Sequence, residues 1–437
     1  MQQILDLHIH SKYSRACSRD LTLSNIDKTC RTKGVDIIAT GDFTYPAWFK
    51  DIKDELEPSS GKGLYRLKGS DDKIKFILST ELALIYKSAD KCRRIHIVLH
   101  APNIEAIQEL NDFLDKKFNI RSDGRPILGM SAPNLVKLCL EIHPKFLIYP
   151  AHIWTPWFSV FGSKSGFDKL EECFEDQTEN IYAYETGLSS DPEMNWRVSA
   201  LDKLTLLSNS DAHSLPNIAR EANVFEMNKV NYDEVYDIIR NKIVYSGDEK
   251  KITHPNPSLK KRRGDTGVKY TIEFYPEEGM YHFDGHRTCG ISLEPEKTKK
   301  NKGICPVCKK PLTVGVLNRV EELADRSVGY KSDTFPHYKK LVELDKIIAE
   351  SINIKSRSSS KVQILYQSLI KDLGSELKIL LDTPIEKIER SGGNRLANAI
   401  DKVRKGELII KPGYDGQYGE VKIFNENEDF NAQKTLF

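Results

Sequence analysis

Short apolar runs alternate with amphipathic stretches from residue 1 to about residue 250 of the chain. Two of the amphipathic stretches, Asn103–Lys117 and Pro133–Glu141, have the spacing of helices. The apolar runs between such stretches are Ile4–Leu7, Val35–Ala39, Ile74–Leu78, Ile95–Leu99, Phe146–Tyr149, Ile181–Tyr184 and Thr205–Leu207. Alternation of strands and helices repeated this often predicts an α/β fold, either a parallel barrel or a parallel sheet. In such folds the chemistry lies at the C-terminal ends of the strands.

The pattern changes after residue 250. Thr253–Gly264 is rich in proline and positive charge, which predicts an interdomain linker. Tyr270–Tyr275 alternates like a strand, and a cluster of cysteine and histidine follows it. The remainder is mostly helical in pattern, as over Tyr338–Ser351 and Val362–Leu373, until the Gly-rich stretch Lys411–Gly419 precedes a short strand and the tail. These changes divide the chain into an α/β barrel (1–250), a basic linker (251–268), a Cys/His module (269–318), a mainly helical C-terminal region (319–425) and a flexible tail (426–437).

Charge and cysteine usage narrow the class of protein only slightly. The chain has 65 Lys and Arg against 63 Asp and Glu, a net charge of +2, yet residues 251–310 hold 13 basic and 7 acidic residues. The N-terminus reaches a strand at once without a signal segment, and no apolar run approaches the ~20 residues that a membrane helix needs. Five of the eight cysteines are scattered without framework spacing. We expect a reduced cytoplasmic protein, associated with the nucleoid and not with a membrane.

Two histidine motifs suggest a metal centre. His8-x-His10 follows the first strand, and residues two apart on a strand point to the same face, so both imidazoles can serve one metal. Asp211-x-His213 stands at a later strand end and would add a carboxylate and an imidazole. A single histidine of this kind is more often a core or surface residue than a ligand, so the inference rests on the ordered set. The candidate ligands at the predicted strand ends are, in chain order, His8, His10, Asp42, Glu81, His96 or His100, His152, Asp211 and His213.

The ligand types in this set indicate the chemistry. Imidazole and carboxylate without thiolate suit Zn, Mn or Fe in a hydrolytic site. A carboxylate such as Glu81 can bridge two metals ~3.5–4 Å apart, an arrangement that grips a phosphoryl group and activates water. His96 is preferred to His100 because it lies inside the apolar run, although a contribution from both stays open. The sequence therefore predicts a polymetal hydrolase.

The ordered motifs resemble those of the PHP (polymerase and histidinol phosphatase) superfamily, which has a distorted (β/α)7 barrel and hydrolyses phosphoesters. The resemblance implies two or three divalent metals, with Zn, Mn or Mg as candidates. It implies that His8 and His10 bind one metal with Glu81 and Asp211, that His96 and His152 bind a second bridged by Glu81, and that His213 helps a third.

One position departs from the superfamily pattern. Many members have Thr-Asp-His where this chain reads Thr40-Gly41-Asp42-Phe43. Phe43 cannot ligate a metal, so Asp42 is expected to take the metal-facing role. Asp211, Asp42 and Glu81 are the carboxylates expected to act in catalysis.

Longer runs carry a narrower resemblance, to endonuclease Q, a PHP-type repair nuclease with a C-terminal zinc module. The runs are Ala39–Trp48, Pro150–Phe158, Glu185–Arg197 and Arg220–Asn223. The resemblance implies hydrolysis of DNA on the 5′ side of deaminated bases (uracil, hypoxanthine, xanthine) and of abasic sites, with damaged DNA as the partner.

A second metal site is predicted in the Cys/His module. His286-x2-Cys289 and Cys305-x2-Cys308 supply four ligands for one closed, structural zinc, with His282 as the substitute if His286 faces away. Lysines between the ligand pairs and the run Lys260–Arg263, with Lys260 and Arg262 as candidates, form a possible phosphate-contacting strip. Charge runs are usually solvated surface, so this strip depends on the nuclease motifs.

Aromatic residues cluster in the two loops that follow Asp42 and His152. An enzyme acting beside a damaged base must extrude and stack that base, so some of these rings are hypothesised to form a base pocket. The rival interpretation is that they pack loop against loop. The candidate base contacts are Trp48, Trp154, Trp157 and Phe158, and Ser189 and Arg197 are candidate DNA contacts.

The C-terminal residues Gln433-x-x-Leu436-Phe437 resemble the pentapeptide by which bacterial replication proteins dock on the sliding clamp. The resemblance implies the clamp as a partner, reached through this tail.

The fold class expected for the whole chain is α/β: a distorted (β/α)7 barrel, a small zinc-binding module and a mostly helical C-terminal region. The expected function is a metal-dependent DNA endonuclease, and a monomer is the expected state. Two alternatives stay open: a PHP-type small-molecule phosphatase of the histidinol-phosphatase kind, and a DNA-binding adaptor with a vestigial metal site.

Overall fold

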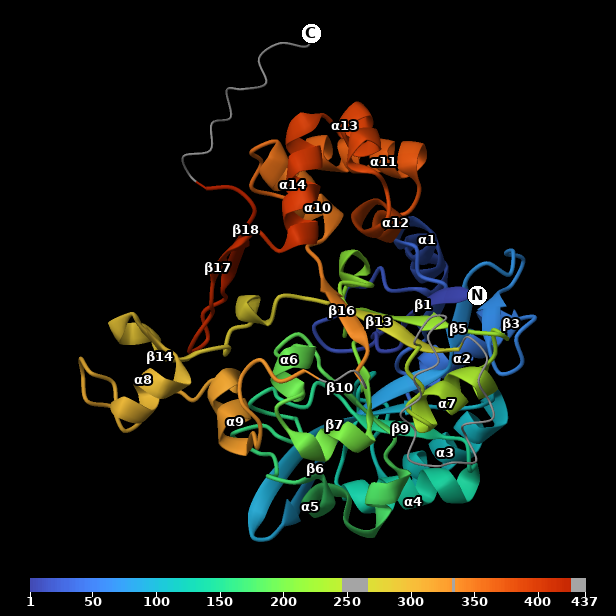
Figure 1. Cartoon of the computed structure of the whole chain (residues 1–437). Coiled ribbons are helices and arrows are strands. Elements are labelled where there is room, and N and C mark those ends of the chain that lie inside the picture. Colours follow the sequence, from blue (N-terminus) through green and yellow to red (C-terminus); the bar gives the residue numbers. More distant parts are fainter. Residues whose placement is uncertain (246–265, 332–334, 426–437) are drawn as a thin grey trace.

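The computed structural model describes residues 1–245, 266–331 and 335–425 (Figure 1). The α/β body occupies the N-terminal part, a small lobe projects from one side, and a helical lobe lies at the top of the view. None of the helices in the described ranges is long and apolar enough to cross a membrane.

The largest sheet has eight strands in the order β16-β13-β12-β1-β2-β5-β4-β3. β1 pairs in parallel with β2, and β2 with β5, whereas β12 runs antiparallel to β1. The strands are β1 (Gln2–Asp6), β2 (Ile37–Ala39), β3 (Leu56–Pro58), β4 (Tyr65–Leu67), β5 (Lys75–Ile77), β12 (Ala222–Glu226), β13 (Gly267–Glu273) and β16 (His337–Lys340). The body is thus built partly from residues beyond 250, because β13 and β16 extend its sheet.

A second sheet has the order β8-β6-β7-β9, and β10 and β11 form a separate parallel pair. These strands are β6 (Ser79–Ser88), β7 (Lys91–His100), β8 (Ile127–Leu128), β9 (Leu147–Pro150), β10 (Ala183–Glu185) and β11 (Thr205–Leu207). A single bridge between Ile9 and Ala212 joins the region after β1 to the region after β11. The hydrogen bonds of the described strands therefore form separate sheets within an α/β body, and the distorted barrel implied by the resemblance is not confirmed by them.

Local signals account for the helices of the body. Thr22 caps α1 by accepting a hydrogen bond from the Asn25 amide, and α1 ends at Gly34, whose φ of 92° favours glycine. Asn103 caps α3 in the same way through the Ala106 amide, which confirms the helix predicted over Asn103–Lys117. The helices are α1 (Leu23–Lys33), α2 (Pro46–Glu55), α3 (Ile104–Lys117), α4 (Ala132–Ile142), α5 (Leu170–Phe174), α6 (Pro192–Asn195) and α7 (Tyr232–Arg240).

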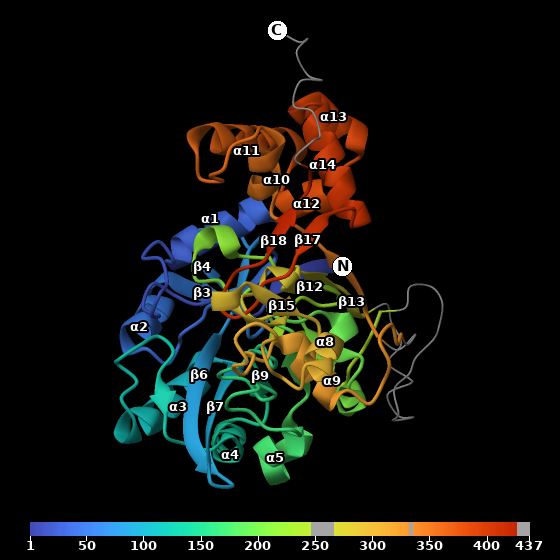
Figure 2. The same cartoon turned by 90° about the vertical axis from the view of Figure 1, so that its left-hand side faces the viewer.

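The small lobe contains the cysteine-rich segment. It comprises the hairpin β14 (Asp284–His286) and β15 (Ile291–Leu293), followed by α8 (Pro295–Lys300) and α9 (Val316–Leu323). Figure 2 shows this lobe facing the viewer, in front of the body. A bridge between Phe283 and Tyr414 ties the lobe to the C-terminal hairpin of β17 (Ile409–Lys411) and β18 (Glu420–Lys422). β18 is the short strand expected after the Gly-rich stretch, whereas β17 precedes that stretch.

The helical lobe is α10 (Leu344–Ser351), α11 (Ser360–Leu373), α12 (Glu376–Leu381), α13 (Ile385–Gly392) and α14 (Asn394–Lys405). The helix expected from Tyr338 begins only at Leu344, because the residues before it pair with β13 as β16. A buried ion pair of 2.9 Å between Lys33 of α1 and Glu376 of α12 fixes the lobe to the body. A β-carbon at Gly34 would lie 2.4 Å from Ser375 Oγ, so glycine also permits this close approach.

Candidate metal centre

Two groups of potential ligands meet in the body and share one carboxylate. The first is His8, His10, Glu81 and Asp211, and the second is Glu81, His96 and His152. The candidate donor atoms of each group lie within 4.8 Å of one another. Glu81 belongs to both groups, which is the position of a bridging carboxylate in a two-metal site.

The backbone brings these residues together by hydrogen bonds between strand ends. The His10 amide donates to Ala212 O at 3.1 Å, and the Asp6 carboxylate at the end of β1 accepts from the Ser210 amide at 3.1 Å. These bonds hold the segment carrying Asp211 beside the His-x-His motif. Asp211 itself has a φ of 46°, an unfavourable conformation for a residue with a side chain, which the surrounding hydrogen bonds maintain.

His152 is placed by a similar close approach. Its φ is 28°, and a β-carbon on Gly187 would lie 2.4 Å from His152 Cβ. The loop after β10 can therefore pack against His152 only because residue 187 is glycine. Glu81 and His96, by contrast, lie within β6 and β7 and not after a strand end.

The distances within the centre match a ligand shell. Glu81 Oε1 lies 2.8 Å from His96 Nδ1 and 3.2 Å from His152 Nε2. His10 Nε2 lies 3.0 Å from Asp211 Oδ1 and 3.3 Å from Glu81 Oε2. Despite these short distances, the buried atoms His8 Nε2, His10 Nε2 and Asp211 Oδ1 have no partner with hydrogen-bond geometry among the described residues. Buried polar atoms without partners are costly, and convergent donors of this kind fit divalent metal ions.

The electrostatics of the centre favour exchange of protons for metal. Burial would lower the pKa of His8, but the carboxylates of Glu185 and Glu81 outweigh it and hold that pKa well above its usual value. Burial would raise the pKa of Glu81, but His96, Arg125 and His8 hold it well below its usual value. The carboxylates of Glu81 and Asp211 are therefore ionised beside protonated His8 and His10, whereas burial lowers the pKa of His96 to about 4. Because ligand histidines must be neutral, metal binding releases these protons and weakens as the pH falls.

Two carboxylates outside the ligand groups, those of Glu185 and Asp42, contact the ligand histidines and orient them. Glu185 lies 3.1 Å from His8 Nδ1 through both of its oxygens, and its Oε2 accepts the His152 amide at 2.9 Å. The Asn209 amide group donates to Glu185 Oε1 at 2.8 Å. A carboxylate on the far nitrogen of a ligand imidazole fixes its tautomer and orientation. The sequence motifs did not single out Glu185, because its role appears only when the end of β10 lies beside β9 and within reach of His8.

Asp42 is the second of these carboxylates and belongs to neither ligand group. Its Oδ1 is 3.0 Å from His10 Nδ1, and its Oδ2 accepts from the Ser11 amide at 2.7 Å and from Ser14 Oγ at 2.8 Å. One oxygen thus contacts the far nitrogen of the ligand candidate His10, and the other is taken up by Ser11 and Ser14. The expectation that Asp42 faces the metal is corrected to a role in orienting His10.

The two remaining candidate histidines, His100 and His213, lie in different positions relative to the centre. His100 Nε2 is 3.0 Å from the Tyr149 hydroxyl, and burial lowers the pKa of His100 to about 3, so the structure brings His96 and not His100 into the centre. The ring of His213 lies 4.6 Å from that of His10, at the edge of the first ligand group, and its Nδ1 contacts Asp211 O at 2.8 Å. A part for His213 in holding a third metal stays a prediction.

The aromatic candidates fall into two sets. Trp48 and Trp154 are buried, and their indole N–H groups donate to Gly41 O at 2.9 Å and to Asn195 Oδ1 at 2.7 Å. For these two residues the base-contact hypothesis is corrected to loop packing. Trp157 is 40% exposed and lies 5.5 Å from the ring of Tyr281 in the small lobe. Phe158 is half-buried, with its ring 4.6 Å from that of His96.

The candidate DNA contacts outside the centre also differ. Arg197 is buried and forms an ion pair with Glu321 of α9, so its expected contact with DNA is corrected to a link between body and small lobe. Ser189 is half-buried, and its part in binding DNA stays a prediction. Lys260, Arg262 and the tail residues Gln433, Leu436 and Phe437 lie outside the described residues.

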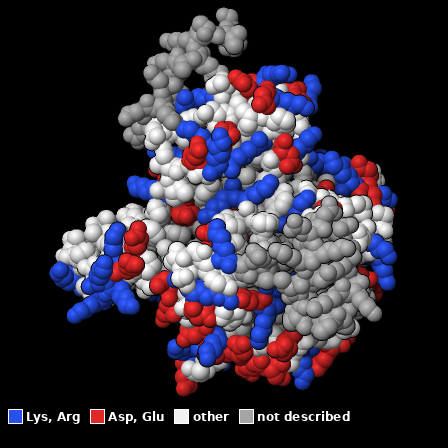
Figure 3. Space-filling view, viewed as in Figure 1, with Lys and Arg blue, Asp and Glu red and all other residues white. Residues whose placement is uncertain are grey.

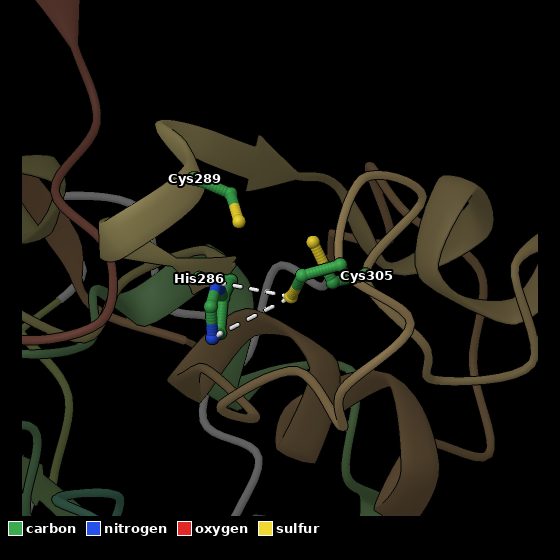
Figure 4. A group of neighbouring side chains, drawn as sticks. His286, Cys289 and Cys305 are labelled. Atoms are coloured by element: carbon green, nitrogen blue, oxygen red, sulfur yellow. Dashed lines mark hydrogen bonds between the residues drawn. The ribbon is translucent and has the colours of Figure 1, made fainter.

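The four predicted zinc ligands converge in the small lobe. His286, Cys289, Cys305 and Cys308 form one group with candidate donor atoms within 4.8 Å of one another, and Figure 4 shows His286, Cys289 and Cys305 facing a common centre. Cys308 Sγ lies 3.7 Å from His286 Nδ1. His282, the alternative ligand, is buried against Phe283 and belongs to no ligand group of the described residues. Three thiols and one imidazole fit a tetrahedral structural zinc.

Basic side chains gather on this lobe. Figure 3 shows Lys and Arg residues over the part of the surface that carries α8. The exposed lysines there are Lys297, Lys299, Lys300, Lys302, Lys309 and Lys310. The lobe thus presents a positive surface beside the zinc-ligand group.

The buried centre has the ligand set of a polymetal hydrolase, and a zinc-ligand group lies in a separate lobe. Residues 343–407, which span α10 to α14, match the family model of the MJ0043 C-terminal domain. The uncharacterized protein MJ0043 of Methanocaldococcus jannaschii is 30% identical over 278 residues, 62% of this chain, and the match spans 31% of that protein's length. The uncharacterized protein YqxK of Bacillus subtilis is 28% identical over 433 residues, which cover 95% of this chain and 98% of that protein.

Solved structures give the identification. The lesion-specific endonuclease PfuEndoQ from Pyrococcus furiosus is 30% identical, with a TM-score of 0.81 over 98% of this chain and 96% of its own. An endonuclease Q bound to a 27-mer duplex substrate with an abasic lesion at the active site is 31% identical, with a TM-score of 0.80 over 98% of both chains. The chain therefore belongs to the endonuclease Q family of DNA-cleaving hydrolases.

Proposed function

We propose that the protein is a metal-dependent DNA repair endonuclease that hydrolyses the phosphodiester on the 5′ side of deaminated bases (uracil, hypoxanthine and xanthine) and of abasic sites. The observation that carries the proposal is the pair of ligand groups sharing the buried Glu81. Similarity over 98% of the chain to an endonuclease Q bound to a duplex with an abasic lesion supports DNA as the substrate.

The residues of the centre would have two roles, holding the metal ions and orienting the ligands. His8, His10, Glu81 and Asp211 would hold one divalent ion, His96, His152 and Glu81 a second, and His213 would help a third. When bound, such ions supply Lewis-acid stabilisation of the phosphoryl group and make a coordinated water more acidic. Asp211 is the most exposed carboxylate of the two groups, at 21%, and therefore faces the side from which a phosphodiester would approach. Glu185 and Asp42 keep the imidazoles oriented behind this face.

A small-molecule phosphatase is the alternative enzyme. The positive small lobe and the helical lobe argue against it, because a metabolite phosphatase needs neither of them to bind a small substrate. The convergence of the ligand groups argues against an adaptor with a vestigial site. Initial rates with histidinol phosphate and with a duplex containing one uracil separate these functions: faster turnover of histidinol phosphate would contradict the proposal, and no turnover of either substrate would favour the adaptor.

Trp157 and Phe158 are the remaining candidates for stacking on an extruded base. Trp157 is exposed in the loop that follows His152, and its ring lies 5.5 Å from that of Tyr281. Replacing it by alanine is expected to lower nicking at uracil about ten-fold, because stacking is worth ~1–3 kcal/mol per base, and to leave nicking at an abasic site nearly unchanged. Nicking rates on matched duplexes provide the measurement. An equal loss on both substrates, or no loss, would contradict a stacking role.

A sliding clamp is proposed as a partner through Gln433, Leu436 and Phe437. The support is the likeness of the C-terminal residues to a clamp-docking pentapeptide. Replacing Leu436 and Phe437 by alanine is expected to abolish capture on immobilised clamp and to leave nicking of short duplexes unchanged. Retained capture of the double variant would contradict the partnership.

A further inference from the structure

Arg125 lies at the metal centre without belonging to either ligand group. Its Nη1 donates to Glu81 Oε2 at 3.0 Å. Among the ion pairs of the described residues, this is the one that joins an arginine or lysine to a carboxylate of the two ligand groups. Glu81 is fully buried, whereas the side chain of Arg125 is 23% exposed. The guanidinium therefore reaches from the bridging carboxylate toward solvent.

The position of Arg125 is set by strand register. β8 pairs in parallel with β6, with Ile127 opposite Ala83, and the Ala83 amide donates to Pro126 O at 3.1 Å. Arg125 precedes Ile127 by two residues, as Glu81 precedes Ala83. The two side chains thus meet at corresponding positions of neighbouring strand ends.

The loop before Arg125 is locked to the rest of the centre. Asp123 Oδ1 accepts from the Arg125 amide at 3.0 Å and from the Arg15 amide at 3.2 Å. A β-carbon at Gly124 would lie 2.5 Å from Asp42 Oδ2, so this loop can pack against Asp42 only with glycine at that position. A guanidinium held this firmly is preorganised to stabilise charge beside it.

We infer that Arg125 binds a non-bridging oxygen of the scissile phosphate, an inference that rests on the proposed function. A guanidinium has five N–H donors, and among the described residues this one has a single hydrogen-bond partner, Glu81. When Glu81 serves as a metal ligand, donors of Arg125 are available for an anion at the exposed side of the centre. Arginine is suited to this contact because its planar donors match phosphate oxygens. Two other basic residues, Arg220 and Lys12, have partners of their own: Arg220 donates to Ser210 O at 2.9 Å, and Lys12 pairs with Asp51 at 2.9 Å.

The test combines a side-chain change with a change at the phosphate. Arg125→Ala is expected to lower the nicking rate at a lesion by about 10²–10³-fold, the loss typical for one preorganised donor, and Arg125→Lys by less. Arg121→Ala is the matched control, because Arg121 lies in the same loop but pairs with Asp115 at the surface. This control is expected to nick at the wild-type rate.

A scissile methylphosphonate, which replaces one charged oxygen by methyl, distinguishes phosphate binding from support of Glu81. The wild type is expected to nick each methylphosphonate diastereomer more slowly than the normal phosphate. For Arg125→Ala this reduction should be about ten-fold smaller on one diastereomer, because that variant already lacks the contact between the guanidinium and the replaced oxygen. Metal content of the variant should equal that of the wild type. An unchanged methylphosphonate penalty, or a variant that loses metal, would overturn the inference and leave the proposed function standing. A fully metallated wild type without lesion nicking would overturn both.

Discussion

Glu81→Gln is expected to lower lesion nicking by at least about 10³-fold, the largest loss from any single change in the centre. Glu81 is the one residue common to both ligand groups, so its removal affects both metal positions. Glutamine has a similar shape but lacks the negative charge and the second oxygen that bridging requires. Bound metal ions stabilise the charge of the transition state. Removing one such stabilising group typically lowers the rate by about 10²–10³-fold, and Glu81→Gln weakens both metal positions together.

Metal content and nicking rate measured on the same preparation test this expectation. The Glu81→Gln protein should bind fewer metal ions than the wild type while keeping its secondary structure. Glu57→Gln serves as the control, because Glu57 forms only a surface ion pair with Arg66. A Glu81→Gln protein that keeps the full metal content and a tenth or more of the activity would rule out a bridging role.

Cys305→Ser is expected to have the second-largest effect, through the small lobe and not through the chemistry. Cys305 is buried at the centre of the zinc-ligand group, and its amide and carbonyl hold the turn through Lys310 O at 2.8 Å and the Lys309 amide at 3.0 Å. A structural zinc contributes about 10–16 kcal/mol of apparent binding free energy, which a lobe with so small a hydrophobic core cannot replace. The lobe should therefore open and lose its ordered positive surface.

Three measurements separate this outcome from general unfolding. Zinc stoichiometry should fall by one, limited proteolysis should cut within residues 279–315, and affinity for duplex DNA should fall. Metal content of the main centre should stay at the wild-type level. Cys92→Ser is the control, because Cys92 is an exposed thiol in β7. A Cys305→Ser protein with full zinc content and an uncut lobe would contradict the structural role.

Residues that follow a strand directly were the easiest part of the centre to predict. His8 and His10 share a face by strand periodicity, and Asp211 meets them because a bridge between Ile9 and Ala212 joins the segments that follow β1 and β11. Glu185 and Arg125 carried no such signal. Their contacts with His8 and Glu81 depend on which strands lie side by side, and that is a property of the folded sheet.

Burial was the main source of error in the sequence interpretation. Trp48 lies near the start of α2 and Trp154 in the loop after His152, and nothing in the local pattern shows that their N–H groups find acceptors inside the body. Asp42 has the right residue type for a ligand, but the hydroxyl and amide of Ser11 draw its carboxylate away from the metal positions. The pairing of β13 with β12 and of β16 with β13 could not be predicted from the sequence either, because it joins distant segments and periodicity does not detect it.

The most direct test of the account is the position of the nick in a duplex that carries a single uracil. Metal-depleted protein should leave the end-labelled duplex intact, and restoring a divalent ion should produce one nick on the 5′ side of the uracil. Asp211→Asn should remove that nick while the protein keeps its fold. Cleavage at the same rate in an undamaged duplex, or no cleavage with any divalent ion although the centre is loaded, would contradict the account.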